Sequence, residues 1–509
     1  MSDHDALVVG SGPNGLAAAI TLARAGRDVL VLEAAERHGG AVATEELTLP
    51  GFRHDTMSSV YPAAAASPVF AEFELERHGL EWVHPRLCMA HPVGGGRAAA
   101  LSRDVEETAA TLDRLHPGDG RAWIEWTKPY LRAFDGLRRT VLGGFPPVRG
   151  VAGLAAGLGP RGLLEFARLA LAPAEALGRE LFRSPASRAW LYGTAMHSDV
   201  PATAPGSAIA SAYLDLLGHV VGWPSPRGGA GALADALVGA LQSHGGRVRT
   251  RARVIRIRVR GGRASGVELA GGERVTAALV IADVTPHALL ALADDALTGR
   301  YARALSRYRY GPATLKVDWA LDGPIPWEAE EPRGAGTVHV GGPEDEVLGA
   351  SVDGAPFMLL GQQSLADPSR APAGKHTAWA YTHGPRDADW TRSDEYVERM
   401  EARIETFAPG FRDLVLARHV QTPAHLERRD ANLVHGDVGN GSNALDQLVF
   451  RPLPSLAPYR TPVRGLYLGS AAAFPGGGVH GAPGHAAARL ALIEQRIRPG
   501  GRSRARRPA

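Results

Sequence analysis

Three glycine residues near the N-terminus have the spacing of a turn that binds the phosphates of a dinucleotide. The turn Gly10-Ser11-Gly12-Pro13-Asn14-Gly15 follows an apolar run at 6–9 and precedes strong helix formers at 16–25. Its first glycine permits the tight turn, its second lets the backbone approach a pyrophosphate, and its third lets the helix pack closely on the strand. The helix N-terminus then faces the phosphates. The residues predicted to bind the cofactor here are Gly10, Gly12, Pro13, Asn14 and Gly15.

An acidic residue stands in register with this turn. Gly26 ends the helix, a second strand covers 28–32, and Glu33 follows it, 18 residues after Gly15. A carboxylate at this place accepts hydrogen bonds from a ribose and repels a 2′-phosphate, so an adenosine ribose is favoured over that of an NADP-type nucleotide. Glu33 and its neighbour Ala34 therefore join the predicted site.

A second glycine pair lies just beyond the acid, where its backbone amides can approach the same pyrophosphate. The segment at 37–44, Arg-His-Gly-Gly-Ala-Val-Ala-Thr, resembles the R-x-G-G segment of the large FAD-binding family that includes amine oxidases, phytoene desaturases and Rab GDP-dissociation inhibitors. The resemblance implies FAD as the cofactor. Many members carry arginine directly after the glycine pair, where this chain has Ala41, which leaves Arg37 as the nearer cationic candidate. The cofactor residues assigned here are Arg37, Gly39, Gly40 and Ala41.

Two later segments are similar to the parts of such a fold that return to the nucleotide. The turn at 226–231, Pro-Arg-Gly-Gly-Ala-Gly, precedes a helical run at 232–243 and an alternating strand at 248–259. In the phytoene desaturase group a similar turn, helix and strand lead to a residue whose backbone holds the adenine, and Val254 matches that position. The apolar strand at 278–283 ends in Asp283, as is common in the family. A separate dinucleotide site in the turn is not expected, because the prolines at 223–226 prevent a strand from running into it.

The most specific match lies near the C-terminus. A buried strand at 465–470 is followed by Phe-Pro-Gly-Gly-Gly-Val-His-Gly-Ala at 474–482 and then by a helix at 484–495. The glycines let backbone amides reach the flavin ring and the ribityl chain with no side chain between. Upstream, 442–448, 451–452 and 459–462 resemble the phytoene-dehydrogenase-like proteins of the pyridine nucleotide-disulfide oxidoreductase domain protein 2 group, and this resemblance covers essentially the whole chain. The cofactor residues assigned here are Gly469, Ser470, Gly477, Gly478 and Val479.

The resemblance implies an α/β fold, with a Rossmann-like FAD-binding domain of the glutathione-reductase type and an inserted α+β substrate domain. A length of 509 residues agrees with two or more lobes. We expect the FAD-binding domain in three segments and the substrate domain in two. The expected order is 1–84 (FAD), 85–224 (substrate, helical), 225–294 (FAD), 295–419 (substrate) and 420–497 (FAD), followed by a disordered basic tail at 498–509.

Few catalytic side chains are required, because a flavin itself carries the electrons once a hydride-donating carbon is held against its ring. His54 and Tyr61 lie in a stretch that passes near the ring in relatives, and His480 adjoins the glycine-rich loop. These three are the candidates for substrate contact or proton handling, with a hydrogen bond to the cofactor as the alternative for His480. No metal site is expected. A single cysteine, Cys88, excludes a Cys-x-x-Cys redox motif and a cysteine-rich metal site.

The predicted function is that of an FAD-dependent oxidoreductase that desaturates or otherwise oxidises an apolar or amphipathic small molecule, with oxygen or a quinone as electron acceptor. Two alternatives stay open. One is non-redox use of the flavin, as in carotene isomerases of the same superfamily, and the other is a flavin-free binding protein like the GDP-dissociation inhibitors. The intact glycine loop at 476–478 argues against the second alternative, since it suits a bound ring.

Composition restricts the remaining partners and the location. The net charge is only +3 and much of the basic excess lies in the tail, so nucleic acid is not expected as a partner. The absence of a signal peptide and of 18 uninterrupted apolar residues favours a cytoplasmic protein. A helical face formed by Leu163, Phe166 and Ala170 belongs to the core, lines an apolar channel or lies on a membrane, so peripheral membrane contact is a further alternative. The resemblance adds a homodimer as an expectation.

Overall fold

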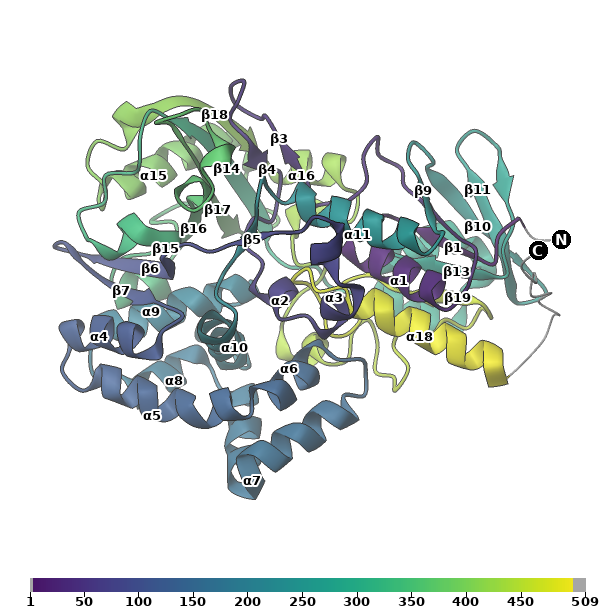
Figure 1. Ribbon diagram of the computed structural model, residues 1–509, viewed down its shortest axis with the longest axis horizontal. Helices are drawn as coiled ribbons and strands as arrows, with labels where there is room; N and C mark the ends of the chain where they lie inside the picture. Colours follow the sequence, from purple (N-terminus) through teal and green to yellow (C-terminus); the bar gives the residue numbers. More distant parts are fainter. Residues whose placement is uncertain (1–2, 498–509) are drawn as a thin grey trace.

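The computed structural model describes residues 3–497, and the predicted basic tail at 498–509 lies outside the described residues. One sheet has five parallel strands in the order β19-β13-β1-β2-β9, drawn from both ends and the middle of the chain (Figure 1). Apolar runs of four residues form the three central strands, because both faces of a parallel sheet are buried. The strands span Leu466–Leu468 (β19), Leu279–Ala282 (β13), Ala6–Val9 (β1), Val29–Leu32 (β2) and Arg247–Arg249 (β9).

Helices cover one face of this sheet and a small meander covers the other. Helix α1 packs between α11 and α18, in one apolar cluster with Ala6 and Val8. Leu7 and Val9 belong to a second cluster that contains Ile257 of the meander, because side chains alternate along a strand. The helices span Pro13–Arg24 (α1), Gly231–Ser243 (α11) and Ala482–Ile497 (α18), and the meander strands span Val254–Arg260 (β10), Arg263–Leu269 (β11) and Arg274–Val275 (β12).

One predicted strand is divided in the structure. The alternating run at 248–259 belongs partly to β9 and partly to β10, with a turn between them in which Arg251 has a φ of 53°. In this turn the Ala252 N–H donates to the Glu33 carbonyl at 2.7 Å, and the Arg251 N–H donates to the Ala35 carbonyl at 2.8 Å. The chain therefore follows the end of β2 before it leaves the parallel sheet. A period of two in the sequence does not reveal such a crossing between sheets.

A second, mixed sheet has seven strands in the order β18-β14-β17-β16-β15-β6-β7. Strand β15 runs parallel to β6, so the sheet joins the stretch 87–101 to the stretch 313–421. One face packs on helices in a cluster that contains Trp190 and Trp379, and the other packs on α15 in a cluster that contains Trp319. The strands span Val415–Gln421 (β18), Ala313–Leu321 (β14), His376–Gly384 (β17), Met358–Gly361 (β16), Ala335–Val340 (β15), Leu87–Gly94 (β6) and Arg97–Leu101 (β7).

Helices from the stretch 105–220 lie below the mixed sheet in Figure 1. They span Val105–Leu115 (α4), Asp119–Arg132 (α5), Phe134–Leu142 (α6), Val148–Leu171 (α7), Ala174–Leu181 (α8), Pro185–Ala195 (α9) and Ser207–Val220 (α10). The remaining strands and helices are Thr44–Glu45 (β3), His54–Asp55 (β4), Trp82–Val83 (β5), Ser225–Pro226 (β8), Pro62–Ala65 (α2), Pro68–Phe73 (α3), Pro286–Ala293 (α12), Gly299–Ser306 (α13), Glu344–Leu348 (α14), Ser393–Glu405 (α15), Pro423–Arg429 (α16) and Leu445–Leu448 (α17). Between residues 3 and 497, no helix is long and apolar enough to cross a membrane.

Buried charges connect the mixed sheet to strand β4 and to the start of α11. The Asp55 carboxylate pairs with the Arg370 guanidinium, Oδ2 to Nη2 at 2.8 Å, and both side chains are almost inaccessible. Its other oxygen accepts the Ala230 N–H at 2.7 Å, next to the start of α11. The Lys316 ammonium of β14 donates to the Asp55 carbonyl at 3.0 Å and pairs with Asp318. Removing one partner of such a pair leaves the other charge buried without compensation, so these contacts fix the elements that they join.

We expect Arg370→Met to destabilise the protein by about 3–5 kcal/mol, because it leaves the Asp55 carboxylate buried and unpaired. The matched control is Arg392→Met, since the Arg392–Glu395 pair is exposed and such pairs contribute about 0.2–1 kcal/mol. Urea unfolding followed by tryptophan fluorescence measures both variants. Equal unfolding midpoints for the two variants would contradict the role given to the buried pair.

Candidate functional site

The two N-terminal glycine segments lie face to face. A side chain at Gly15 would overlap the Gly10 carbonyl, so helix α1 can approach β1 this closely only with glycine there. A Cβ on Gly40 would lie 3.3 Å from the Gly12 Cα. The turn and the R-x-G-G segment therefore form one cradle at the N-terminus of α1. The predicted cofactor residues that the structure brings together here are Gly10, Gly12, Pro13, Asn14, Gly15, Gly39 and Gly40.

Glu33 ends β2 at the edge of this cradle. Its Oε2 accepts the Ser11 N–H at 2.9 Å and the Ser11 hydroxyl at 2.6 Å, and its Oε1 accepts the Ala35 N–H at 2.8 Å. Three donors from the protein thus fix both oxygens. A carboxylate keeps further lone pairs for a ligand hydroxyl, so this geometry is compatible with the predicted ribose contact.

Asp283 ends β13 against the same turn. Its Oδ2 accepts the Gly15 N–H at 2.8 Å, and a Cβ on Gly12 would lie 2.9 Å from that oxygen. The carboxylate therefore occupies the N-terminus of α1, where an anion is also expected to bind. Burial raises the pKa of Asp283 to about 7, and the nearby charges of Asp430 and Glu33 add to this rise. The predicted cofactor residue is thus a carboxyl group that titrates near neutral pH.

The other predicted contacts of this half lie around the cradle. Ala41 packs against a small apolar cluster that contains Met57, and no cation occupies its place. Arg37 and Ala34 are exposed. Val254, the predicted adenine contact, begins β10 just after the turn that follows the end of β2. The phosphate end of the cradle is therefore built from backbone N–H groups and carboxyl groups.

The C-terminal glycine loop begins directly after β19, whose end leads into Gly469 and Ser470. Within the loop, a Cβ on Gly476 would overlap the guanidinium of Arg451, and a Cβ on Gly477 would lie 3.0 Å from the Gly439 carbonyl. Arg451 is fully buried and donates to the Tyr308 hydroxyl at 2.9 Å. The loop is thus supported from behind by an immobilised arginine. Gly478 and Val479 continue it, both with positive φ.

His480 has both ring nitrogens bonded to the chain itself. Its Nε2 lies 3.1 Å from the Gly477 carbonyl, and its Nδ1 accepts the Ala482 N–H at 3.2 Å. Its own carbonyl accepts the Ser67 hydroxyl at 2.7 Å. Burial lowers the pKa of the imidazole to about 4, so the ring is neutral at neutral pH. In this arrangement His480 fastens the glycine loop to the first turn of α18.

His54 and Tyr61 are also buried and bonded within the protein. The His54 Nε2 lies 2.7 Å from the Thr48 hydroxyl, and burial together with the Lys316 charge lowers its pKa to about 3. The Tyr61 hydroxyl donates to the Ser58 carbonyl at 2.7 Å, and burial raises its pKa. Each of the three predicted catalytic side chains thus has its polar atoms engaged by neighbours in the chain.

The structure places beside the loop a polar pair that sequence analysis missed. The Nε2 of His383, on β17, lies 2.7 Å from an oxygen of Asp199, and its Nδ1 lies 3.1 Å from the Thr314 hydroxyl. Burial lowers the pKa of the His383 imidazole, but the Asp199 carboxylate, the Asp437 charge and a backbone contact with Ala313 together raise it above its ordinary value. A Cβ on Gly439 would lie 3.0 Å from the other Asp199 oxygen, and the Gly439 carbonyl faces Gly477. The pair and the glycine loop thus share Gly439 as a neighbour.

A local signal for one member of this pair exists. The run at 376–384 alternates and predicts a strand with Trp379, Tyr381 and His383 on one face, and these rings follow one another at centroid distances of 5.9 and 5.1 Å. Asp199 is 184 residues earlier, in the short segment after α9, where no pattern marks it. Only the fold brings the two side chains together.

The residues present fit FAD. Glycine segments from both ends of the chain pack closely by their backbones around the N-terminus of α1, which suits a long cofactor that crosses this helix end. Three buried polar atoms near these segments have no hydrogen-bond partner within residues 3–497, namely Asn14 Oδ1, Thr56 Oγ1 and Asn440 Oδ1. When bound, FAD supplies a two-electron acceptor for a hydride.

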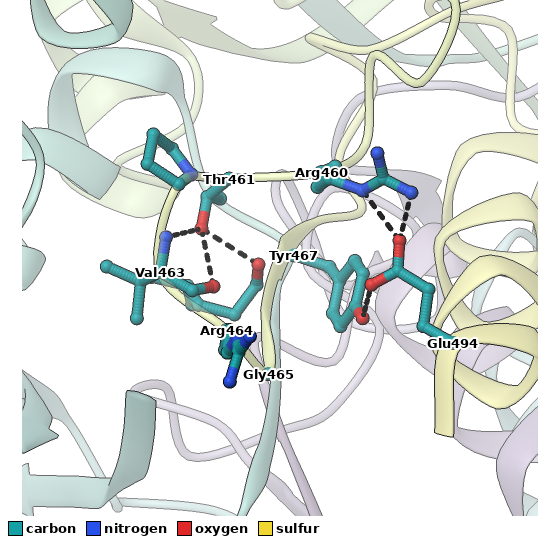
Figure 2. A pocket seen from close by; sticks show the side chains of 9 residues that line it. Arg460, Thr461, Val463, Arg464, Gly465, Tyr467 and Glu494 are labelled. Atoms are coloured by element: carbon teal, nitrogen blue, oxygen red, sulfur yellow. Dashed lines mark hydrogen bonds and ion pairs between the residues drawn. The ribbon is translucent and has the colours of Figure 1, made fainter. Parts of the chain in front are cut away.

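A separate cavity of about 380 Å³ lies at edge strand β19, and none of the predicted cofactor residues lines it (Figure 2). Glu494 forms one wall, where it accepts the Tyr467 hydroxyl at 2.7 Å and pairs with Arg460. The Thr461 hydroxyl donates to the Leu466 carbonyl at 2.9 Å. The polar groups of this cavity thus bond to one another, and it does not coincide with the cradle.

Comparison with known proteins agrees with the resemblance seen in the sequence. The model of the family described as flavin-containing amine oxidoreductase matches residues 14–492. The rat protein named pyridine nucleotide-disulfide oxidoreductase domain-containing protein 2 is 30% identical, over 96% of this chain and 93% of its own. A phytoene desaturase of Cercospora nicotianae is 28% identical, over 63% of this chain and 51% of its own. The predicted relationship is confirmed.

Solved structures confirm the predicted α/β fold class. Wild-type putrescine oxidase bound to putrescine superposes with a TM-score of 0.63 at 18% identity, over 96% of this chain and 99% of that one. At this identity the likeness concerns the fold alone. It accounts for the parallel sheet and the mixed sheet together, since it extends along nearly the whole chain.

We expect the affinity for FAD to fall as the pH rises above about 7, because deprotonation of Asp283 puts a negative charge beside the predicted pyrophosphate position. Binding then takes up a proton. Asp283→Asn should bind FAD with little dependence on pH and about 30-fold more tightly at pH 8.5 than the unchanged protein, as proton linkage over about 1.5 pH units above a pKa of about 7 implies. Titration of the apoprotein with FAD, followed by quenching of FAD fluorescence, measures this. The control is the exposed Asp235→Asn, and an identical slope in all three proteins would refute the role of Asp283.

Proposed function

The chain belongs to the family of flavin-containing amine oxidoreductases, and on this premise we propose that it is an FAD-dependent oxidoreductase of the phytoene-desaturase-like type. It removes a hydride from an apolar or amphipathic small molecule, and oxygen or a quinone takes up the electrons. The predicted cofactor residues at both ends of the chain hold the FAD. Which bond of the substrate is oxidised depends on the space between the glycine loop and the mixed sheet.

One observation carries this proposal. Glycine segments more than 400 residues apart in the chain approach one helix, α1, and the last of them lies next to a polar pair on the mixed sheet. Gly477 faces Gly439, and Gly439 faces Asp199. Only Gly439 therefore separates a flavin ring held by this loop from the Asp199 carboxylate, which can accept a proton. Both a hydride acceptor and a proton acceptor are needed to form a double bond.

The mixed sheet supports an apolar substrate with one polar position. Trp379 and Tyr381 stack on the face that carries His383, and Trp379 belongs to the large apolar cluster under the helices. His383 and Asp199 add a polar position to this surface. An amphipathic molecule would place its hydrocarbon part on the aromatic rings and its reacting end at the pair. The phytoene desaturase relative agrees with such a substrate class.

The residues of the chain then act as binding and proton-handling groups. Bound FAD would supply the acceptor for a hydride from one substrate carbon. The Asp199–His383 pair takes up the proton that the neighbouring carbon loses, so that one double bond forms in the substrate. Asp199 holds the His383 ring through Nε2, and Thr314 holds it through Nδ1. The walls of helices and sheet keep water from the site.

Anaerobic mixing of the FAD-loaded protein with polyenes, long-chain amines and long-chain alcohols tests the proposal. We expect the flavin absorbance to bleach with at least one class and to return when oxygen or a quinone is admitted. A colourless protein that takes up no added FAD would refute the proposal. Isomerisation of a polyene without bleaching would replace it with the non-redox alternative.

Substitution of Asp199 tests the polar pair. Asp199→Asn removes the charge that raises the His383 pKa, so the pH at which flavin reduction is half-maximal should move to lower values. The rate of reduction should fall about 100-fold, as expected on loss of a positioned proton acceptor. Stopped-flow bleaching at a series of pH values measures both effects, and the exposed Asp394→Asn is the control. An unchanged pH profile with normal flavin content would mean that the pair only supports the fold.

A further inference from the structure

Helix α7 exposes a large apolar surface that no other element of the described chain covers. It has 24 residues, of which only Gly150, Leu154 and Leu169 are buried. It carries four charged residues, and most of its other positions are apolar. In Figure 1 it projects from the lower edge of the molecule, beyond the helices that it contacts. Exposure of these apolar side chains to water costs free energy unless another surface covers them.

The exposed residues of α7 form two adjacent stripes. The chain kinks at Gly159, which has a φ of 68°. After the kink, an exposed apolar stripe with helical spacing comprises Pro160, Leu164, Ala167 and Leu171. One position further round the helix, an exposed charged stripe comprises Arg161, Glu165 and Arg168. The side of the helix turned away from the protein is therefore itself amphipathic.

The exposed apolar stripe differs from the helical face of Leu163, Phe166 and Ala170, for which the sequence analysis left membrane contact as an alternative. Leu163 and Phe166 are half-buried and pack against the apolar cluster of the helices, and Ala170 is half-buried as well. The structure therefore agrees with the interpretation that these three residues belong to the core. Leu164 and Leu171, with 71% and 60% of their surface exposed, lie on the opposite side.

A second exposed segment continues this surface toward the glycine loop. Of the twelve large apolar side chains that the structure exposes, four lie on α7 and four lie in the segment 438–456, which is eight of twelve. Phe450 of that segment contacts Phe145, just before α7, with ring centroids 6.2 Å apart. Phe145 in turn lies 5.1 Å from Phe474 at the start of the glycine loop. The exposed apolar residues are Val148, Val151, Leu164 and Leu171 on α7, and Val438, Val449, Phe450 and Leu456 in the segment.

Charge and shape decide what covers this surface. Arg149 and Arg161 are exposed and have no ion-pair partner among the residues 3–497. These two arginines therefore give the surface uncompensated positive charge. A lipid surface needs no complementary shape. Apolar side chains beside arginines are the pattern of helices that lie at the interface of an anionic membrane.

We propose that α7 and the segment 438–456 dock the protein on the surface of a membrane that contains anionic lipids. The stripe of Leu164 and Leu171 enters the boundary between headgroups and acyl chains, and Arg149 and Arg161 contact the lipid phosphates. The proposal of docking depends only on the exposed residues of this surface. Its consequence, the entry of an apolar substrate from the bilayer beside Phe145 and Phe474, rests on the proposed function.

Flotation of the FAD-loaded full chain with vesicles tests the docking. The vesicles are phosphatidylcholine alone and phosphatidylcholine mixed with phosphatidylglycerol. We expect binding to the mixed vesicles that weakens as salt is added. Leu164→Glu with Leu171→Glu should reduce this binding more than tenfold, because two exposed leucines no longer enter the lipid. Arg149→Gln with Arg161→Gln should reduce it about fivefold for each arginine, and only on the anionic vesicles.

The matched control is Ile255→Glu with Leu416→Glu, which changes exposed apolar residues on β10 and β18 and should leave binding unchanged. Equal flotation of the leucine variant and this control would overturn the proposal. A dimer in light scattering that the leucine variant converts to a monomer, without vesicle binding, would overturn it in favour of a second copy as the occupant. Flavin content and melting temperature confirm that each variant folds. Flotation does not depend on turnover, so absence of vesicle binding would refute the docking and leave the proposed oxidoreductase activity unaffected. A protein that floats but is colourless and takes up no FAD would refute only the oxidoreductase activity.

Discussion

The packing of helix α1 on strand β1 without an intervening side chain is the constraint on which the rest of the structure depends. At Gly15 any Cβ would overlap the Gly10 carbonyl, so the backbone alone sets the distance between helix and strand. This brings the N-terminus of α1 to the ends of β2 and β13, where Glu33 and Asp283 are bonded to the turn. The same helix forms the surface on which α11 and α18 pack, so the later segments of the cradle take their position from it.

Buried charge is arranged differently at the two ends of the site. Between the sheets, Arg370 and Lys316 are paired with carboxylates, and each pair is close to neutral as a unit. At the turn, no cation among residues 3–497 lies beside Asp283, and Ala41 stands at the position where the sequence resemblance implies an arginine. Phosphates bound there would be held by backbone N–H groups and the helix dipole. Such a site binds an anion best when its own carboxyl group is protonated, which couples the cradle to pH without any change of fold.

The strands of the parallel sheet were well predicted because their sequence signals are local. Short apolar runs next to glycine turns require a parallel strand followed by a close helix, and β1, β2, β13 and β19 all lie within the predicted runs. The prediction of a single strand at 248–259 was less accurate, because the chain bends at Arg251 through hydrogen bonds to the residues that follow β2. His480 drew attention as a histidine near the flavin loop, but sequence does not reveal that Gly477 and Ala482 engage its ring. Contacts such as Asp199 with His383 depend on sheet order, and no local pattern encodes them.

The surroundings of the glycine loop are polar on one side and apolar on the other. Gly439 connects the loop to Asp199, whereas Phe474 connects it to Phe145 and, through that ring, to the exposed Phe450. A wholly polar substrate would gain nothing from the phenylalanine side, and a wholly apolar one would offer no polar group to the Asp199–His383 pair. The arrangement therefore favours a molecule that is long and apolar with one polar or polarisable position. The same reasoning gives the direction of entry, since the apolar side of the loop is the side that is continuous with the outer surface.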